Sequence, residues 1–522
     1  SPRRGEVPPL MSDEKNMRNE KDQLDEERPH DAMGTARRLW QAAGKQRWRL
    51  VVAAVSAIVY VAASLGAAAY SAHVVDVLWE HIQQSFAAGE PYVVGLDNGG
   101  REVLIYLGIW TCAWVFYSVQ SLVMSSFAER LNLSLRKEIS AKLGRLPLSY
   151  FDAHQPGDTI SRATNDLDKV SEVLQRGLLQ LIIAFTTLVG AVVLMLVSNL
   201  VLALVFCGFA AASVVVTRFA ARRTLDAAAA RQDALGHLTE SVEEAYSGRT
   251  VIKAFGVEDA SLEAVELRAE KVAATSARAD FLTNAISPVI RFLMRLSQVA
   301  IGLAAGVLVA GGQMSVGAFQ AFFQYVTQAS EPLTQLSLTV NMLQGALAAA
   351  ERVFALLDSA EISPDPEVPV ELPKPVQGRV AFEHVRFGYS PEAPLMRDVS
   401  LVAEPGQKVA IVGATGAGKT TLINLLMRFY EVDGGCITLD GVDTRQLRRR
   451  DLRREFGMVL QDAWLFEGTI AENIAYGRPG ATREEVEAAA RAAHVDFFVR
   501  TLPHGYDTML TDGGENVSQG QR

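Results

Sequence analysis

The sequence has few charged residues, almost no cysteine and no basic tail. Charged residues make up 21% of the 522 residues and hydrophobic residues 49%, and the mean hydropathy is +0.13. This balance is too apolar for an ordinary soluble enzyme and too charged for a pure membrane bundle, so it predicts a chain that is part membrane and part soluble. The net charge is −9, and nothing in the sequence points to nucleic acid.

The cysteines and histidines exclude two further kinds of protein. Cys112, Cys207 and Cys436 lie far apart, so they form neither a disulfide framework nor a metal-binding spacing. The eight histidines are scattered without a ligand pattern. No signal peptide precedes the first apolar run, and the polar residues 1–36 are expected to form a disordered tail.

Six apolar segments are long enough to cross a membrane, for which about 20 apolar residues are needed. They are Leu50–Ala72, Val103–Phe127, Gly177–Val197, Leu200–Thr217, Asn284–Ala310 and Val316–Leu338. Basic residues gather before the first span and in the long segments after the second and fourth, whereas the outer loops hold only Arg101. The positive-inside rule then predicts cytoplasmic termini. We expect 37–358 to form a six-span transmembrane domain with two long cytoplasmic helical loops.

A phosphate-binding loop marks the second part of the chain. The Pro-rich segment 359–377 reads as a linker, and a soluble domain is expected from 378 to 522. Within it, Val409–Val412 reads as a buried strand, which is followed by the pattern G-x-x-x-x-G-K-T and then a helical pattern. The loop residues are Gly413, Ala414, Thr415, Gly416, Ala417, Gly418, Lys419, Thr420 and Thr421.

Such a loop binds nucleotide phosphates for physical reasons. Its glycines let backbone N–H groups point at the phosphates, and the helix N-terminus adds its positive end. Lys419 is predicted to reach the β- and γ-phosphates of ATP, and Thr420 is predicted to hold Mg²⁺.

Three further features, in order along the chain, point to one family. Tyr389 lies in "FGYSPEAPL" upstream of the loop, Gln461 lies in "GMVLQDAWLFEG", and the chain ends on "VSQGQR". Together with the loop and behind six spans, these features resemble the ATP-binding cassette (ABC) transporters, specifically the exporter-type half-transporters. The resemblance covers nearly everything from about residue 37 to the end. It implies an α-helical six-span membrane domain followed by an α/β P-loop nucleotide-binding domain.

The resemblance also implies roles for single residues. Tyr389 looks like the aromatic that stacks on adenine. Gln461 looks like the glutamine that meets Mg²⁺ and the attacking water. The signature motif, usually LSGGQ, is represented by Ser518, Gly520 and Gln521, and it departs from the family at Val517 and Gln519. In the family the signature completes the ATP site of the other subunit, so a dimer with a second half-transporter is implied.

The two long segments match the family as well. Tyr150–Val170 resembles the first cytoplasmic segment, with a coupling helix near Phe151–Gly157, and Glu243–Ala260 resembles the second. Glu515 resembles an acidic residue that touches these loops. The resemblance implies that both segments dock on nucleotide-binding domains.

The last span carries a polar stripe. Gln320, Gln324, Gln328, Glu331 and Gln335 recur on one helical face, and they are expected to face the bundle interior or a water-filled cavity because polar groups in lipid are costly. Arg291 and Arg295 lie four residues apart in the fifth span. Contact with an anionic or amphipathic substrate, pairing with Glu331 and snorkelling to the interface all stay open for them.

The expected function is ATP-driven export of a hydrophobic or amphipathic compound (a drug, lipid or peptide-like molecule) across the plasma membrane. Two alternatives stay open: a regulatory, non-catalytic half of a heterodimer, suggested by the altered signature, and an importer of the same fold, of the siderophore type. In the family, the catalytic glutamate region follows the signature, and none of it can be assigned here. We therefore expect these residues to be a fragment of a longer transporter that hydrolyses ATP only as the full-length protein.

Overall fold

The computed structural model describes residues 29–522 except 90, 391, 461, 462 and 515. The chain divides into two compact units, residues 1–362 and 363–522. Each unit is described by itself below.

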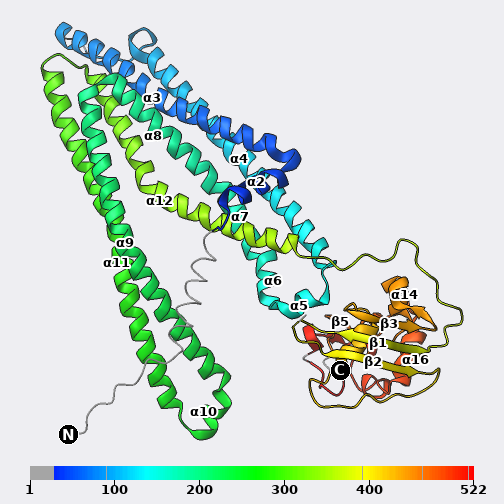
Figure 1. Cartoon of the computed structure of the whole chain (residues 1–522). Coiled ribbons are helices and arrows are strands. Elements are labelled where there is room, and N and C mark those ends of the chain that lie inside the picture. Colours follow the sequence, from blue (N-terminus) through cyan, green and yellow to red (C-terminus); the bar gives the residue numbers. More distant parts are fainter. Residues whose placement is uncertain (1–28, 90, 391, 461–462, 515) are drawn as a thin grey trace, which may run out of the picture. The chain divides into compact units, whose positions relative to one another are not determined.

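The described part of unit 1 consists of helices and the loops that join them (Figure 1). Its long helices are α3 (Arg47–Ala88), α4 (Arg101–Leu143), α8 (Leu179–Ser198), α9 (Leu200–Ser247), α11 (Glu258–Ala310) and α12 (Val316–Asp358). Its short helices are α2 (Ala32–Ala42), α5 (Leu148–Ala153), α6 (Pro156–Ala163), α7 (Asn165–Glu172) and α10 (Arg249–Phe255), with single turns η1 (Gly44–Gln46), η2 (Leu96–Gly100) and η3 (Val173–Leu178).

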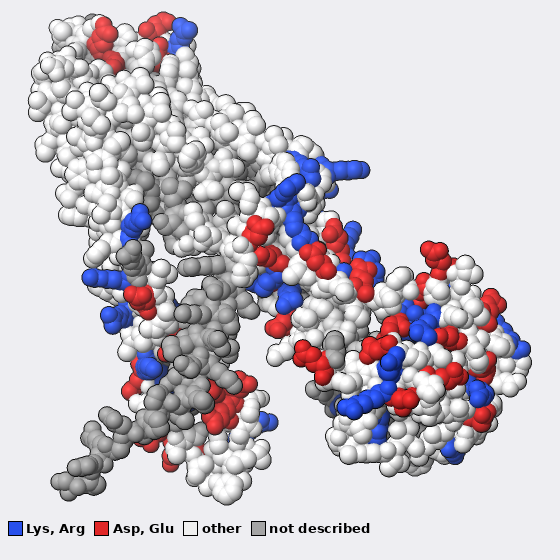
Figure 2. All heavy atoms as spheres, viewed as in Figure 1, with Lys and Arg blue, Asp and Glu red and all other residues white. Residues whose placement is uncertain are grey.

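Six helical segments in the described part of the chain are long and apolar enough to cross a membrane, as the sequence predicted. They are Gly44–Ala88, Leu96–Leu143, Pro156–Ser198, Leu200–Ser247, Glu258–Ala310 and Thr339–Asp358. The space-filling view agrees, because the helical body of unit 1 shows a broad uncharged surface with its charged side chains gathered toward its ends (Figure 2). The chain is therefore a multi-pass membrane protein.

The sixth predicted span, Val316–Leu338, lies in the first half of α12, and the apolar stretch Thr339–Asp358 lies in the second half of the same helix. Several side chains of the predicted span are outside the described residues, so its exact position stays a prediction. The first half of α12 packs inside the bundle, where Phe322 and Val326 are buried in a cluster with residues of α3, α8, α9 and α11.

Two helices of unit 1 stand out by their length and partnership. The helices α9 and α11 have 48 and 53 residues, so they run about 70–80 Å at 1.5 Å per residue, far beyond about 30 Å of hydrocarbon. They lie side by side and are joined at their far end by α10 (Figure 1). The segment predicted at Glu243–Ala260 forms this tip, and the one at Tyr150–Val170 folds as α5, α6 and most of α7.

Ion pairs fasten the last turns of α12 to neighbouring helices. Arg38 of α2 donates two hydrogen bonds to Asp358, at 2.6 and 2.8 Å. Arg352 of α12 donates through both Nε and Nη2 to Asp166 of α7, whose side chain is only 10% exposed. Bidentate pairs of this kind fix direction as well as distance. The end of α12 is therefore held from two sides.

Unit 2 contains a four-stranded antiparallel sheet in the order β2-β1-β3-β4. Its strands are β1 (Val380–Phe387), β2 (Met396–Ala403), β3 (Gly434–Leu439) and β4 (Val442–Asp443). The helix α13 (Lys419–Leu426) packs on this sheet through Leu425, which is buried with Phe382 and Val385.

A second cluster of unit 2 is mostly helical. It contains α15 (Ile470–Ala475), α16 (Arg483–Ala492) and α17 (Asp496–Val499), beside the short pair β5 (Gly468–Thr469) and β6 (Met509–Leu510). The helix α14 (Arg449–Arg454) lies near the sheet, where Leu452 is buried with Leu439.

The prediction of a buried strand at Val409–Val412 is wrong. These residues form no strand and are exposed, Val412 by 91%. The equally apolar residues Val459 and Leu460 are also exposed and outside any strand. An apolar run becomes a buried strand only where neighbouring strands take up its backbone hydrogen bonds, and no strand in the described residues pairs with either segment.

Replacing Arg352 with alanine is expected to lower the free energy of unfolding of unit 1 by about 2 kcal/mol, because the nearly buried Asp166 carboxylate then loses its guanidinium partner. Arg136→Ala is the matched control, because its partner Asp168 lies on the same helix but is 62% exposed. The control is expected to change the free energy by less than about 0.5 kcal/mol. The midpoint of thermal unfolding in detergent is the measurement, and equal shifts for both variants would contradict the prediction.

Candidate nucleotide-binding site

The phosphate loop has the backbone geometry that its glycines were expected to allow. Gly416 and Gly418 adopt left-handed conformations, with φ of +83° and +87°, which side chains with a Cβ rarely adopt. Gly418 is also the N-cap of α13, and a Cβ there would lie 3.2 Å from Cε of Met396. The chain therefore turns tightly from the loop into the helix at this point.

Lys419 is positioned inside the loop. Its Nζ donates to the carbonyl oxygens of Gly413 at 3.0 Å and Ala414 at 2.8 Å. The ammonium thus lies where the loop curls round, in front of the first turn of α13. Thr420 follows it and is exposed, whereas Thr421 is buried. This place combines a positive charge, an exposed backbone and the N-terminus of α13. Such a combination favours the binding of a phosphate group.

Tyr389, the predicted adenine-stacking residue, lies beside the loop. Its hydroxyl is hydrogen-bonded to Oγ1 of Thr421 at 2.9 Å. Its ring meets those of Phe387 and Tyr430 edge to face, with centroids 5.0 and 5.2 Å away. The side chain is nevertheless 55% exposed. The sheet carries Tyr389 to this place, because the residue comes two positions after the end of β1.

The signature begins with the geometry of a helix start. Ser518 N donates to Oε1 of Gln521 at 2.8 Å, and Gln521 N donates to Oγ of Ser518 at 3.3 Å. This reciprocal pair is a capping box. Val517 packs against the helical cluster of unit 2, and Gly520 is exposed with open space around it. In the described part of the chain, no hydrogen bond joins residues 516–522 to the phosphate loop.

The other predicted site residues have different outcomes. The loop residues Thr415 and Ala417 lie on the exposed stretch before α13. Gln461 and Glu515 lie outside the described residues, so their roles stay predictions. The sequence alone did not indicate the arginines around the far end of α13, because no motif marks them.

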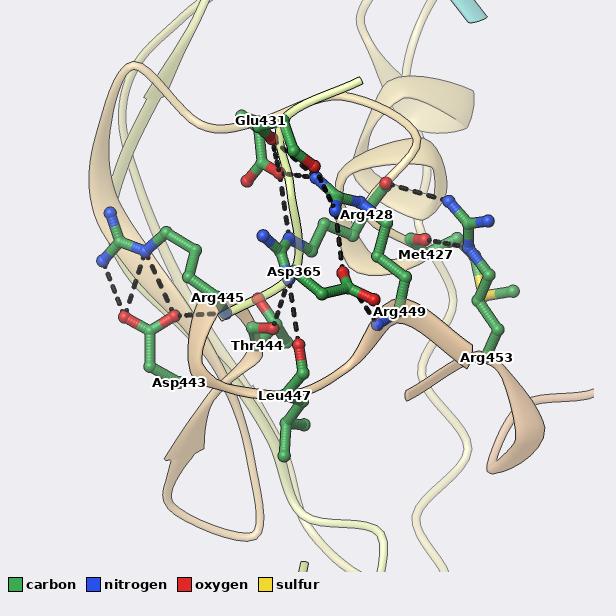
Figure 3. A network of polar contacts seen from close by, with 11 residues as sticks. Asp365, Met427, Arg428, Glu431, Asp443, Thr444, Arg445, Leu447, Arg449 and Arg453 are labelled. Atoms are coloured by element: carbon green, nitrogen blue, oxygen red, sulfur yellow. Dashed lines mark hydrogen bonds and ion pairs between the residues drawn. The ribbon is translucent and has the colours of Figure 1, made fainter. Parts of the chain in front are cut away.

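Arg428 and Arg453 hold that far end (Figure 3). Arg453 donates to the carbonyl oxygens of Met427 and Arg428, at 3.0 and 3.1 Å. Arg428 is only 6% exposed and donates to the carbonyl oxygens of Thr444 and Leu447. Basic side chains on the last carbonyls stabilise a helix end.

Arg449 extends this network to the first residues of unit 2 (Figure 3). It donates to Asp365 at 2.8 Å, to the Ser363 carbonyl oxygen at 2.7 Å and to Glu431 at 2.6 Å. Nearby, burial opposes ionisation of Asp443, but hydrogen bonds from the side chain and backbone of Arg445 lower the pKa of that carboxyl below its usual value. The phosphate-loop helix is thus anchored at one end and open at the other.

Comparison with known proteins identifies the family to which the chain belongs. A model of the ABC transporter transmembrane region matches residues 50–333, and an ABC transporter model matches residues 396–522. The chain belongs to the ABC transporter family, which confirms the resemblance found in the sequence. It accordingly contains both the transmembrane region and the ATP-binding domain of that family.

Individual proteins of this family show how similar the chain is to its relatives. A fatty acid ABC transporter ATP-binding/permease protein of Mycobacterium bovis is 45% identical over 81% of this chain. An ABC transporter ATP-binding protein of Bacillus subtilis is 34% identical over 94% of the chain and 79% of its own length. An ATP-dependent lipid A-core flippase of Thiobacillus denitrificans is 35% identical over 80% of the chain and 72% of its own length. The match to the mycobacterial protein spans 66% of that protein's length.

Replacing Arg449 with alanine is expected to raise amide hydrogen exchange in residues 419–428 by about tenfold, because the anchor of α13 loses its bonds to Asp365 and Glu431. Arg450→Ala is the matched control, since Arg450 is the next residue on the same helix and is exposed. Hydrogen exchange followed by mass spectrometry measures both. Unchanged exchange in the Arg449 variant would contradict the prediction.

Proposed function

We propose that this protein is an ATP-driven exporter of a lipid or another hydrophobic or amphipathic compound. The observation that carries the proposal is one chain with six membrane-spanning segments and a phosphate loop whose Lys419 ammonium lies inside the loop. Relatives named as a fatty acid transporter and a lipid A-core flippase support a lipid as the transported compound.

ATP would occupy the loop with its phosphates against the backbone N–H groups and Lys419. Tyr389 would stack on adenine, and its hydrogen bond to Thr421 would keep the ring at the loop. Thr420 fits Mg²⁺, because its exposed hydroxyl follows Lys419 on the first turn of α13. Gln461 is the proposed second ligand. Bound Mg²⁺ would neutralise phosphate charge during transfer.

A second half-transporter would complete the working protein. The lack of hydrogen bonds between residues 516–522 and the loop in the described part of this chain fits a signature that serves a partner's ATP. The tip of the α9–α11 hairpin also exposes apolar side chains, among them Tyr246 by 70% and Phe255 by 78%. Exposed apolar residues gathered at one place mark sites of protein contact. We propose that the tip contacts a nucleotide-binding domain on the cytoplasmic side of the plasma membrane.

ATP binding would then drive transport by favouring one arrangement of the dimer. A ligand shifts a conformational equilibrium only through contacts that differ between the two states. The signature of one chain against the ATP of the other is such a contact, since it exists only when the nucleotide domains meet. Hydrolysis would remove it and reset the dimer.

A second candidate is a regulatory half in a heterodimer. The signature residues Val517 and Gln519 depart from the family pattern, which favours two unequal ATP sites. The mass of the intact complex, measured after this gene is expressed alone, distinguishes a homodimeric exporter from the regulatory half of a heterodimer. A homodimer with ATPase activity is expected for the first candidate, and an inactive chain that becomes active with a different partner for the second.

Lys419→Ala in the protein expressed from its complete gene is expected to weaken ATP binding at least tenfold and to abolish ATPase activity, because a charge-assisted bond to phosphate contributes about 1.5–3 kcal/mol. Lys408→Ala is the control, since Lys408 is an exposed lysine ahead of the loop. Binding of a fluorescent ATP analogue and phosphate release are the measurements. An unchanged ATP affinity in the Lys419 variant would sink the proposed site.

A further inference from the structure

A cavity of about 450 Å³ lies among the helices α3, α4, α8 and α12 in the membrane-spanning part of unit 1. Three members of the polar stripe, Gln328, Glu331 and Gln335, line it from α12. A hydrogen bond at 3.5 Å joins Oγ of Ser64 on α3 to Oε1 of Gln328. The stripe thus borders a space large enough for part of a small organic molecule.

The described lining of this cavity contains an acidic residue and no basic residue. Among its described lining residues, Glu331 is the one carboxylic acid, and no lysine, arginine or histidine lines it. Neither Arg291 nor Arg295 of α11 is among the described lining residues, and Arg295 donates to Oε1 of Gln298 at 2.9 Å. An acid that shares a cavity with residues of three apolar spans is expensive to keep and is a mark of function.

Aromatic rings face the same space. Tyr60 of α3 and Tyr117 of α4 both line the cavity, with ring centroids 5.3 Å apart and planes inclined by 55°. Trp110 lies seven residues before Tyr117 and so on the same face of α4. Glu331 lines the same cavity as these rings. The rings and the acid therefore belong to one site.

Tyrosine and tryptophan rings beside a carboxylate form the chemistry that recognises an ammonium group. Ring faces attract cations, and quaternary ammonium ligands are the best-known case. A fatty carboxylate would instead meet the negative charge of Glu331, which disfavours two ionised acids in one site. The apolar lining residues Val61, Ile183 and Pro332 suit the carbon chain next to such a head group.

We infer that this cavity binds the cationic amine head group of an amphiphile through Glu331 and the rings of Tyr60, Tyr117 and Trp110. The inference rests on the proposed function, since it names the class of compound that the exporter carries. It departs from the mycobacterial relative, whose name refers to fatty acid.

The test is equilibrium binding to the protein in lipid nanodiscs, without nucleotide and with empty nanodiscs as the blank. Dodecyltrimethylammonium and dodecanoate, used below their micellar concentrations, share a chain and differ in head-group charge. Isothermal titration calorimetry is expected to give at least about tenfold tighter binding of the ammonium compound, as a desolvated cation–π contact with a carboxylate allows.

Variants separate a charge effect from loss of fold. Glu331→Gln is expected to weaken ammonium binding about tenfold, whereas Glu331→Asp retains most of it. Tyr117→Leu is expected to weaken binding about threefold and Tyr117→Phe less than twofold, because phenylalanine keeps the ring. Glu80→Gln is the matched control, since Glu80 is an exposed acid near the end of α3 and is not a lining residue.

Each outcome decides the inference. Equal affinity for both probes, tighter binding of dodecanoate, or a preference unchanged in Glu331→Gln overturns it. ATP-dependent transport and ATPase activity are measured on the same preparations. Normal ATP-driven transport without an ammonium preference overturns the inference alone. A Glu331-dependent ammonium preference supports the inference, and if ATPase activity and transport are both lacking, it is the proposed function that fails.

Discussion

Unit 1 depends on one constraint: a backbone N–H or carbonyl in hydrocarbon must find its partner within the protein. Helices satisfy this requirement locally, and the described residues of 1–362 accordingly contain helices and connecting loops but no strand. The same constraint makes polar side chains in the spans informative, because each must face protein or water rather than lipid. Gln328, Glu331 and Gln335 of α12 meet this requirement by lining a cavity with residues from three other helices, whereas Gln320 and Gln324 of the same stripe do not line it. Structure and chemistry of the membrane part therefore follow from the same rule.

The candidate nucleotide site follows a different rule, in which the backbone itself is the proposed ligand-binding group. The left-handed glycines Gly416 and Gly418 keep the loop open to phosphate, and Lys419 supplies charge at its centre. The side chains that give the site its rigidity lie elsewhere. Arg453 and Arg428 hold the far end of α13, and Arg449 connects that end to the first residues of unit 2. An open binding end and an anchored rear end divide the helix into a functional and a structural half.

Sequence patterns predicted most of the architecture, because the relevant signals are local. Apolar length identified the spans, and the order of Tyr389, the phosphate loop and the signature identified the family. Two kinds of feature were not predicted correctly from the sequence. The network of Arg428, Arg449 and Arg453 depends on carbonyl oxygens brought together by folding, which no residue spacing encodes. The strand predicted at Val409–Val412 failed because its formation depends on neighbouring strands rather than on its own apolar residues. Features set by local sequence could therefore be predicted, whereas features that depend on contacts between distant segments could not.

The α9–α11 hairpin has a mechanical consequence. Its root is packed in the bundle core, where α9 contributes Phe206 with Ala210 at the edge, and α11 contributes Ile290 with Ile286 at the edge. Among the described residues, α9 and α11 then run side by side as far as α10 (Figure 1). From Ile286 to the start of α11 at Glu258, this arm is about 42 Å long at 1.5 Å per residue. A tilt of about 10° at its root would carry α10 about 7 Å sideways along this length, so a rearrangement of a few side chains inside the membrane becomes a displacement larger than the pitch of one helical turn.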